Sequence, residues 1–363
     1  MRRTFVALIA STLLWQSSGF SFFAAKSVVG SSLYQQNNRM PTTIQPSSST
    51  TSTSLCTVYS VPSSSSSSTP SISLSSSDRI DSQTFEKQVR FFRVIAFSIA
   101  SFVLWNQELI NAFISDLYFK LISNSFYVHY SFEPLWASTC FALSIFAFWV
   151  VDKWVPSLHK YRIQKSNSMQ AWKNRVQDGL THEVPWYLGF WIPFGGIMKA
   201  RRIPSTAPTL GLVAREVCSA LFIYDFLFFV GHNLLHRVPF LYKHVHSKHH
   251  KMHTVRAGDS VRHSFMDGMW DVICAVVALN VLKAHAFSRL VFNATAIYLI
   301  VEAHSGINFP WMLHNIVPFN IFAGPVVHDL HHQGGSKNFQ KFFTYLDSFF
   351  DTRMTNPRAY EFA

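Results

Sequence analysis

Two segments of the chain share one histidine spacing, His246-Ser-Lys-His249-His250 and His328-Asp-Leu-His331-His332. A third segment, His232-Asn-Leu-Leu-His236, has two histidines four residues apart. The chain has 17 histidines, and 14 of them lie between His232 and His332. Spacings of three and four place side chains on one face of a helix, so each segment can direct two or three imidazoles toward one point.

These three segments predict a metal site with two ions. Neutral imidazole is a good ligand for iron, zinc, copper and nickel. Eight histidines are too many for one ion, because a metal takes about four to six ligands. A loose metal-collecting tract would not need a repeated spacing. We therefore expect three histidine-rich helices to converge on a dinuclear site.

Three acidic residues near the histidine segments are candidates to support the ligands. Asp225 lies seven residues before His232, two helical turns along the same face, in an otherwise uncharged run. Asp329 and Glu302 are the other two. A carboxylate commonly accepts the outer N–H of a ligand imidazole and fixes its tautomer. We predict this role for all three residues.

The composition indicates a membrane protein. Hydrophobic residues make up 48% of the chain and charged residues only 14%, whereas an ordinary soluble domain is about a quarter charged. The four cysteines are far apart with no C-x-x-C pair, which argues against a disulfide framework, a thiolate zinc site or an iron–sulfur cluster. Net charge is +12, and it is +8 beyond residues 1–77. This modest, scattered charge suits a membrane surface better than a nucleic-acid groove, so we expect no nucleic acid partner.

Several apolar stretches are candidates for membrane segments. Two are fair transmembrane helices, and they lie around residues 94–105 and 135–151. Residues 217–230 have Asp225 as their only charge, and Lys283, His285 and Arg289 divide residues 272–301 into a hairpin or two half-helices. An aromatic run interrupted by proline, residues 186–194, is typical of a re-entrant or interfacial piece. We predict an all-α integral membrane protein with about four transmembrane helices and a helical cap, on the cytosolic or stromal face, that holds the metals.

The chain divides by composition into four parts. Residues 1–20 resemble a signal peptide, with a basic start and a short apolar run. Residues 21–85 are Ser-rich and predicted to be disordered, and they also suit a transit peptide. Membrane helices are expected over residues 86–215 and the histidine-rich domain over residues 216–363. The leader fits either a plastid protein or a protein of the endoplasmic reticulum, so the sequence is compatible with either membrane as the location.

The stretch from Tyr224 to Thr352 resembles the fatty acid hydroxylase superfamily of membrane non-haem diiron enzymes. Within it, the chain is similar to the cholesterol 25-hydroxylases and C4-methyl sterol oxidases. The resemblance rests on the three histidine segments, the Asp225 run and three further motifs: Val238-Pro-Phe-Leu-Tyr242, Glu302-Ala-His304-Ser-Gly and Leu346-Asp-Ser-Phe-Phe-Asp-Thr352.

The resemblance implies ligands, cofactors and partners. By it, the eight histidines of the three segments are iron ligands, His304 completes the set and His263 is an additional candidate. No catalytic residue is implied beyond the ligands. The implied cofactors are two Fe²⁺ ions, with O₂ as co-substrate. The sequence has no G-x-G-x-x-G motif and no fused cytochrome b5 domain, so the electrons come from a separate donor, either cytochrome b5 or ferredoxin.

The implied activity is O₂-dependent hydroxylation or oxidation of a sterol or other lipid within the bilayer. One alternative on the same scaffold is a lipid or sterol desaturase, or an isoprenoid epoxidase. An alternative of another class is a metal-binding or metal-transport membrane protein, which predicts ionisable residues along several spanning segments. Residues 135–151 carry no charge, and the histidines lie outside the most apolar runs. Both observations favour the enzyme.

Overall fold

The computed structural model describes residues 80–164, 184–197, 203–252 and 254–354. The predicted signal segment at residues 1–20 and most of the Ser-rich leader lie outside these residues. The described part of the chain contains helices and no strand, apart from two isolated bridges, so the predicted helical class is confirmed for it. The first described helix, α2 (Ser82–Trp105), begins where the Asp81 side chain accepts a hydrogen bond from Thr84 N.

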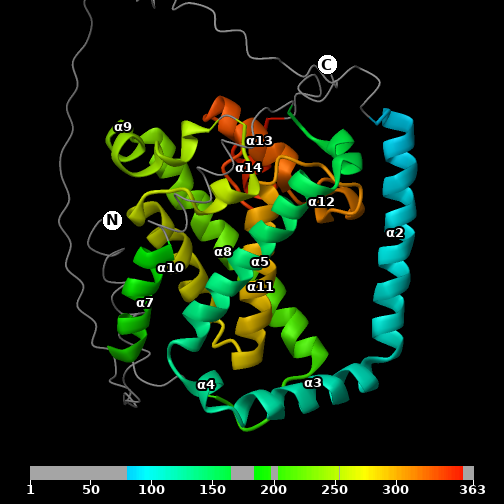
Figure 1. Cartoon of the computed structure of the whole chain (residues 1–363), viewed down its shortest axis with the longest axis vertical. Helices are drawn as coiled ribbons and strands as arrows, with labels where there is room; N and C mark the ends of the chain where they lie inside the picture. The colour runs from blue at the N-terminus through cyan, green and yellow to red at the C-terminus, as the bar shows by residue number, and fades with distance from the viewer. Residues whose placement is uncertain (1–79, 165–183, 198–202, 253, 355–363) are drawn as a thin grey trace, which may run out of the picture. The chain divides into compact units, whose positions relative to one another are not determined.

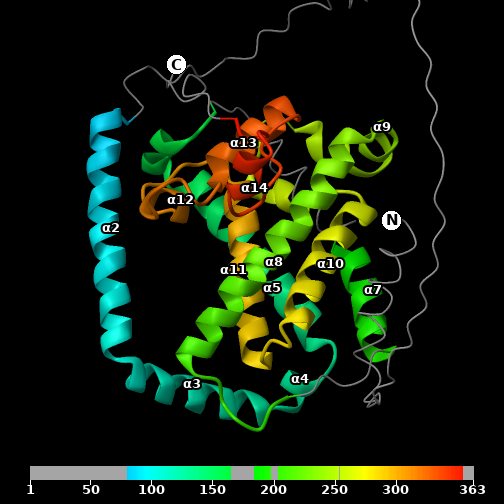
Figure 2. The same cartoon turned by 180° about the vertical axis from the view of Figure 1, so that it is seen from behind.

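Four helices form the central bundle, and each of them packs against at least one other. They are α5 (Phe132–Trp154), α8 (Leu210–Arg237), α10 (Phe265–Val281) and α11 (Ala286–Ala303). Helix α11 contacts both α5 and α8, and α10 lies along α8 (Figures 1 and 2). Tyr224, Phe228 and Phe292 are buried where α8 and α11 meet. Close approach of α10 to α8 depends on Gly231, since a Cβ there would lie 2.2 Å from the Trp270 ring nitrogen.

The predicted interruption near residues 283–289 is confirmed. Helix α10 ends at Val281, and α11 begins at Ala286, where the His285 ring accepts a hydrogen bond from Phe287 N. The chain therefore reverses between two helices, and the shorter α10 has 17 residues.

Short helices at the end of the bundle form the cap. They include α9 (Pro239–Leu241), η4 (Tyr242–His246), η5 (His249–Lys251), η6 (Ala257–Val261), α12 (Leu313–Ile316), α13 (Gly324–Gly334) and α14 (Tyr345–Phe349). At the opposite end lie α3 (Gln107–Ile122) and α4 (Ser125–Val128) (Figure 1). After α5 the chain forms η2 (Pro156–Tyr161), and α7 (Val184–Ile197) packs against α5. At 14 residues, α7 is about 21 Å long, shorter than a bilayer core.

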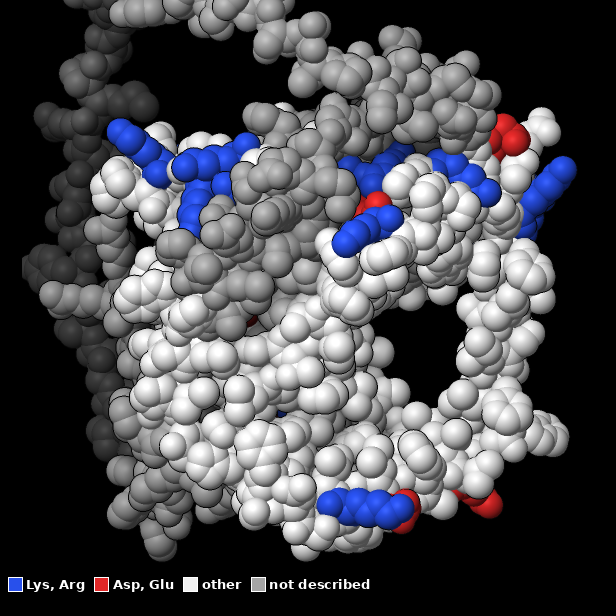
Figure 3. All heavy atoms as spheres, in the orientation of Figure 1, with Lys and Arg blue, Asp and Glu red and all other residues white. Residues whose placement is uncertain are grey.

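Three described helices are long and apolar enough to cross a membrane, and they are α2, α5 and α11. The predicted number was about four. Charged side chains in Figure 3 lie toward the cap and at the opposite end of the molecule, and the band between them is almost free of charge on this face. Large apolar side chains such as Phe97 and Trp105 of α2 and Phe146 of α5 are exposed. An uncharged band with exposed aromatic residues is the surface of a protein in lipid.

A buried ion pair joins α5 to the cap, and it yields a stability prediction. The Asp152 carboxylate lies 2.7 Å from the Arg162 guanidinium and 3.8 Å from that of Arg256, and all three side chains are largely buried. We expect Asp152→Ala to lower the free energy of unfolding by about 3 kcal/mol, because it leaves buried cations without their carboxylate. Thermal unfolding of the purified protein in detergent measures this. Unchanged stability would contradict the structural role of the pair.

Candidate metal centre

The structure brings together all nine histidines predicted as ligands. They form two groups, and within each group the candidate ligand nitrogens all lie within 4.8 Å of one another. The five-histidine group consists of His232, His236, His246, His250 and His331, and the four-histidine group of His249, His304, His328 and His332. His263 belongs to neither group. The two groups are adjacent, since the rings of His250 and His332 stack with their centroids 4.7 Å apart.

The two groups do not follow the three sequence segments. The segment from His246 to His250 contributes to both groups, as does the segment from His328 to His332. In α13, His328 and His332 lie on one face, four residues apart, and enter the same group. His331 is about 100° around the helix from His332, so it points to the other group. Each adjacent His-His pair therefore joins the two groups.

Backbone geometry ends α13 immediately after its histidines. Gly335 has a φ of +64°, and its N–H donates to the His331 carbonyl at 2.7 Å. This is the left-handed C-terminal turn that glycine adopts without strain. The turn brings the Lys337 carbonyl back to the His331 ring, where it accepts a hydrogen bond from Nδ1 at 2.7 Å.

In five of the nine rings, Nδ1 forms a hydrogen bond with an oxygen atom of the surrounding chain. Four of these nitrogens face a backbone carbonyl and one faces a carboxylate. The pairs are His232 with Phe339 O at 2.8 Å, His331 with Lys337 O at 2.7 Å, His304 with Ile300 O at 2.7 Å, His249 with Arg262 O at 3.3 Å and His246 with Asp267 Oδ2 at 2.8 Å. A carbonyl only accepts, so Nδ1 carries the proton, and in a neutral ring Nε2 is left with a lone pair.

In neutral rings these lone pairs face one another. The Nε2 atoms of His232 and His246 are 3.1 Å apart, and those of His304 and His249 are 3.3 Å apart. Two acceptors cannot form a hydrogen bond. Two nitrogen ligands about 2.1 Å from one metal ion are about 3.0–3.4 Å apart, which fits these separations. Nε2 of His236 is also buried and has no hydrogen-bond partner among the described residues. The residues present therefore fit a bound cation in each group.

The protonation state of the rings agrees with metal binding. Burial lowers the pKa of His304 and of His331 to about 3. Burial also holds the pKa of His328 and of His332 well below the usual value. These rings are therefore neutral near pH 7, and neutral imidazole is the form that binds a metal.

The structure corrects the predicted role of Asp225. The carboxylate is fully buried, but it does not contact an imidazole. It accepts hydrogen bonds from Gln340 Nε2 and from the backbone N–H groups of Lys341, Phe342 and Phe343, at 2.6–3.3 Å. Asp225 thus holds the segment whose Phe339 carbonyl binds His232. Its effect on the ligands is indirect.

The other two acidic residues also lack the predicted contact. Asp329 accepts hydrogen bonds from the side chains of Gln164 and Gln333. Glu302 is buried two residues before His304, and its polar neighbour is the Tyr298 hydroxyl. In the described part of the chain neither carboxylate bonds to a ligand ring. The direct contacts predicted for Asp329 and Glu302 are therefore wrong.

In the described part of the chain, the acidic residue that bonds to a candidate ligand ring is Asp267, which sequence reasoning missed. It lies in the first turn of α10, where Ser264 accepts a hydrogen bond from its N–H. Its position shows no regular spacing to the histidine segments, so only the packing of α10 beside η4 brings it to His246. The nearby His263 lines a cavity instead of joining a group.

Comparison with known proteins shows the family of the chain. The sequence model described as fatty acid hydroxylase matches residues 217–352. Human cholesterol 25-hydroxylase is 34% identical over 213 residues, which cover 57% of this chain and 76% of that protein. The chain belongs to the fatty acid hydroxylase family. A cholesterol 25-hydroxylase-like protein of Danio rerio is 28% identical, covering 61% of this chain and 90% of that protein. A putative methylsterol monooxygenase of Dictyostelium discoideum is 29% identical, covering 58% and 77%.

No solved structure matches the chain significantly. Membership of the fatty acid hydroxylase family makes the chain an oxidoreductase of a metal-dependent, membrane-associated group. The family match contains all nine histidines of the two groups, together with Asp225 and Asp267.

The division into two groups predicts different results for two neighbouring residues. We expect His331→Gln to remove the metal of the five-histidine group and His332→Gln that of the four-histidine group, because glutamine is a poor substitute for a neutral imidazole. Metal analysis of each purified variant should give about half the wild-type content. The double variant should retain almost none. Retention of the full content by either single variant would contradict the assignment of that residue.

The Asp267 contact predicts a selective loss of metal affinity. We expect Asp267→Asn to weaken metal binding about 10–100-fold, because the neutral amide accepts the His246 N–H less strongly than a carboxylate. Competition with a chelator measures the affinity. The matched control is Asp329→Asn, which changes another buried carboxylate that, in the described part of the chain, accepts hydrogen bonds from glutamine side chains. Equal losses in the two variants would argue against a specific role for Asp267.

Proposed function

We propose that the protein is an O₂-dependent diiron monooxygenase that hydroxylates or oxidises a sterol or another lipid within a membrane. The observation that carries the proposal is the convergence of nine imidazoles into two adjacent groups whose Nε2 atoms face one another. The family and the names of the similar proteins support a sterol or lipid substrate. Two groups support two ions, and we propose Fe²⁺ for both.

Different residues of the site have different roles. The nine histidines would hold the ions, and iron bound there would supply activation of O₂ for attack on an unactivated C–H bond. The Phe339 and Lys337 carbonyls orient His232 and His331, and Asp267 orients His246. The Asp267 carboxylate also places a negative charge beside the five-histidine group, which favours a cation there.

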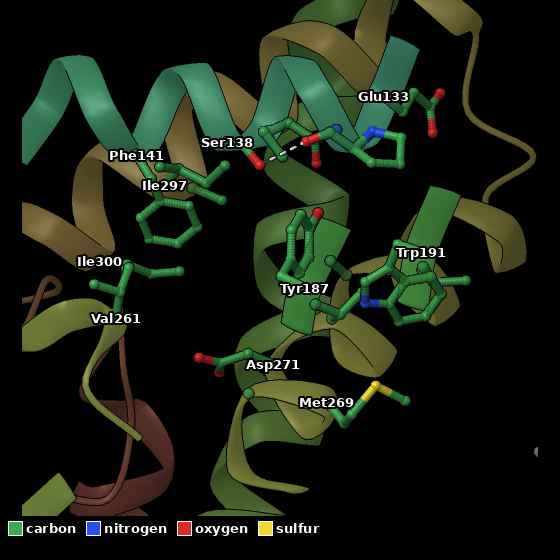
Figure 4. Close-up of a pocket in the computed structure, with 18 of the residues that line it drawn as sticks. Glu133, Ser138, Phe141, Tyr187, Trp191, Val261, Met269, Asp271, Ile297 and Ile300 are labelled. Atoms are coloured by element: carbon green, nitrogen blue, oxygen red, sulfur yellow. Dashed lines mark hydrogen bonds between the residues drawn. The ribbon is translucent and has the colours of Figure 1, made fainter. Parts of the chain in front are cut away.

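A cavity of about 210 Å³ beside the histidine groups suits an apolar substrate. Its walls come from α5, α7, α8, α10 and α11, and most of its lining is aliphatic or aromatic (Figure 4). Ile300 lines it, and the Ile300 carbonyl binds the His304 ring. Gly268, which follows Asp267, lines it as well. A lipid in this cavity would be shielded from water beside the metals.

We propose a membrane arrangement to match. About four segments cross the bilayer, including α2, α5 and α11, and the cap faces the cytosol or the stroma. Residues 1–20 serve as a signal and the following stretch up to residue 85 as a leader, so the membrane is that of the endoplasmic reticulum or a plastid. Residues 86–215 supply membrane helices, and residues 216–363 form the histidine-rich domain. Cytochrome b5 or ferredoxin supplies the electrons.

An isotope experiment tests the proposed chemistry. We expect membranes of cells that express the chain to form a hydroxylated sterol or lipid with one oxygen atom from ¹⁸O₂. Lipid profiling by mass spectrometry measures the product. The double variant His331→Gln and His332→Gln should remain in the membrane and form none, because each group loses a ligand. A product that has lost two hydrogens without gaining oxygen would identify a desaturase instead, and turnover by the double variant would refute the metal site.

A further inference from the structure

A buried ion pair connects two cavities near the metal centre. Lys341 lies in the segment after α13, and its Nζ donates to Asp271 Oδ1 of α10 at 2.7 Å. Asp271 lines the large cavity, the one of about 210 Å³ beside the histidine groups. Lys341 lines the small cavity, which lies between α11, α12 and the first residue of α13. The pair therefore crosses the wall between the two cavities.

One oxygen of the Asp271 carboxylate is left for the large cavity. Oδ1 accepts hydrogen bonds from Lys341 and, at 2.9 Å, from the Tyr224 hydroxyl, whereas Oδ2 has no hydrogen bond in the described part of the chain. Figure 4 shows the carboxylate directed toward the end of the cavity where Ile300 lies. Because the Ile300 carbonyl binds the His304 ring, this is the end nearest the metal centre.

The Lys341 ammonium is enclosed by the protein close to the ligands. Only 6% of the residue is exposed, and Nζ lies 3.8 Å from the centroid of the Phe228 ring. After burial and two neighbouring rings, the Lys341 charge also lowers the pKa of His328. Burial disfavours the charged form of each partner of an ion pair. The neutral pair, with the proton on Asp271, is therefore closer in free energy to the ion pair than it is in water.

The small cavity gives Lys341 a contact with water. Its volume is about 10 Å³, which is room for about one water molecule. Glu302 and His314 line it together with Lys341. Nε2 of His314 bonds to the Asn308 side-chain oxygen at 3.0 Å, so Nδ1 carries a lone pair, and this buried nitrogen has no partner among the described residues. A water here can donate to His314 and pass a proton to Lys341, and the half-buried His314 ring leads to the cap surface.

We propose that Lys341 and Asp271 form a relay that carries protons from the cap side into the large cavity beside the metal centre. The inference rests on the proposed function and deepens it. The proposed reaction consumes the lipid, O₂, two electrons from the separate donor and two protons, and it yields the hydroxylated lipid and one water. Lys341 Nζ passes each proton to the Asp271 carboxylate, which releases it into the large cavity. Water in the small cavity then returns a proton to Lys341.

The variant Lys341→Arg separates proton transfer from the structural tie between α10 and the segment after α13. Arginine keeps the charge and can bond to Asp271, but it does not give up its proton. We expect metal content and thermal unfolding in detergent to stay near the wild-type values. Formation of the ¹⁸O-labelled lipid in membranes should fall about 100-fold, as for loss of a positioned proton donor. O₂ that gains two electrons should instead leave as hydrogen peroxide, which takes its protons from bulk water.

Two controls fix the baseline of this experiment. Lys120→Arg makes the same change in the ion pair of Lys120 with Asp116 on α3, and it should keep the wild-type yield. Membranes with the double variant His331→Gln and His332→Gln give the background of peroxide. A wild-type yield of labelled lipid in Lys341→Arg would overturn the relay.

A balanced removal of both charges tests the same path without adding volume. Lys341→Met combined with Asp271→Asn leaves neither buried charge unpaired, so the protein should fold and keep its metal. We expect the same loss of labelled lipid and the same release of peroxide. A wild-type yield, or loss of the metal together with the product, would show that the pair is only structural and would overturn the proposal. Absence of labelled lipid in wild-type membranes would refute the proposed function instead.

Discussion

The structure depends on one electrostatic constraint, the convergence of nine imidazole rings whose Nε2 atoms face one another. The rings of His249 and His304, whose pKa values burial lowers, face each other with their Nε2 atoms 3.3 Å apart. Without a cation this arrangement is unfavourable, since the rings have lost water and gained no partner. The free energy of metal binding is therefore also free energy of folding for the cap. The surrounding chain orients five of the rings through hydrogen bonds at Nδ1.

Buried carboxylates support that orientation at a distance. Asp225 and Asp347 both accept hydrogen bonds from the segment around residues 339–343. The Gln340 side chain connects the two residues, because its Nε2 donates to Asp225 and its Oε1 accepts from the Asp347 N–H. Carbonyl groups of this segment and of the preceding turn then hold His232 and His331. Because a backbone carbonyl can only accept, it fixes the tautomer of the ring it contacts. The loop after α13 is thus as much a part of the metal centre as the helices.

The sequence predicted the convergence of the three histidine segments and the reversal between α10 and α11, because both depend on local spacing. It did not predict the division of each His-His pair between two groups, which depends on where other helices lie. The spacing of Asp225 and His232 placed them on one helix face. The Asp225 carboxylate, however, accepts hydrogen bonds from the backbone N–H groups of Lys341 and Phe342. Asp267 has no spacing signal at all. Local periodicity shows which residues share a face and does not show which element packs against it.

Helix α11 connects the two ends of the site. It ends at His304, a candidate ligand, and carries Ile300, Asn293 and Arg289 along the cavity wall. A helix buried between α5 and α8 keeps the distance between these residues nearly constant, whereas groups on separate loops would move relative to one another. The Glu133–Arg289 pair adds to this by tying the start of α11 to α5. The residues at the start of α11 and the histidine at its end therefore keep fixed positions along the cavity.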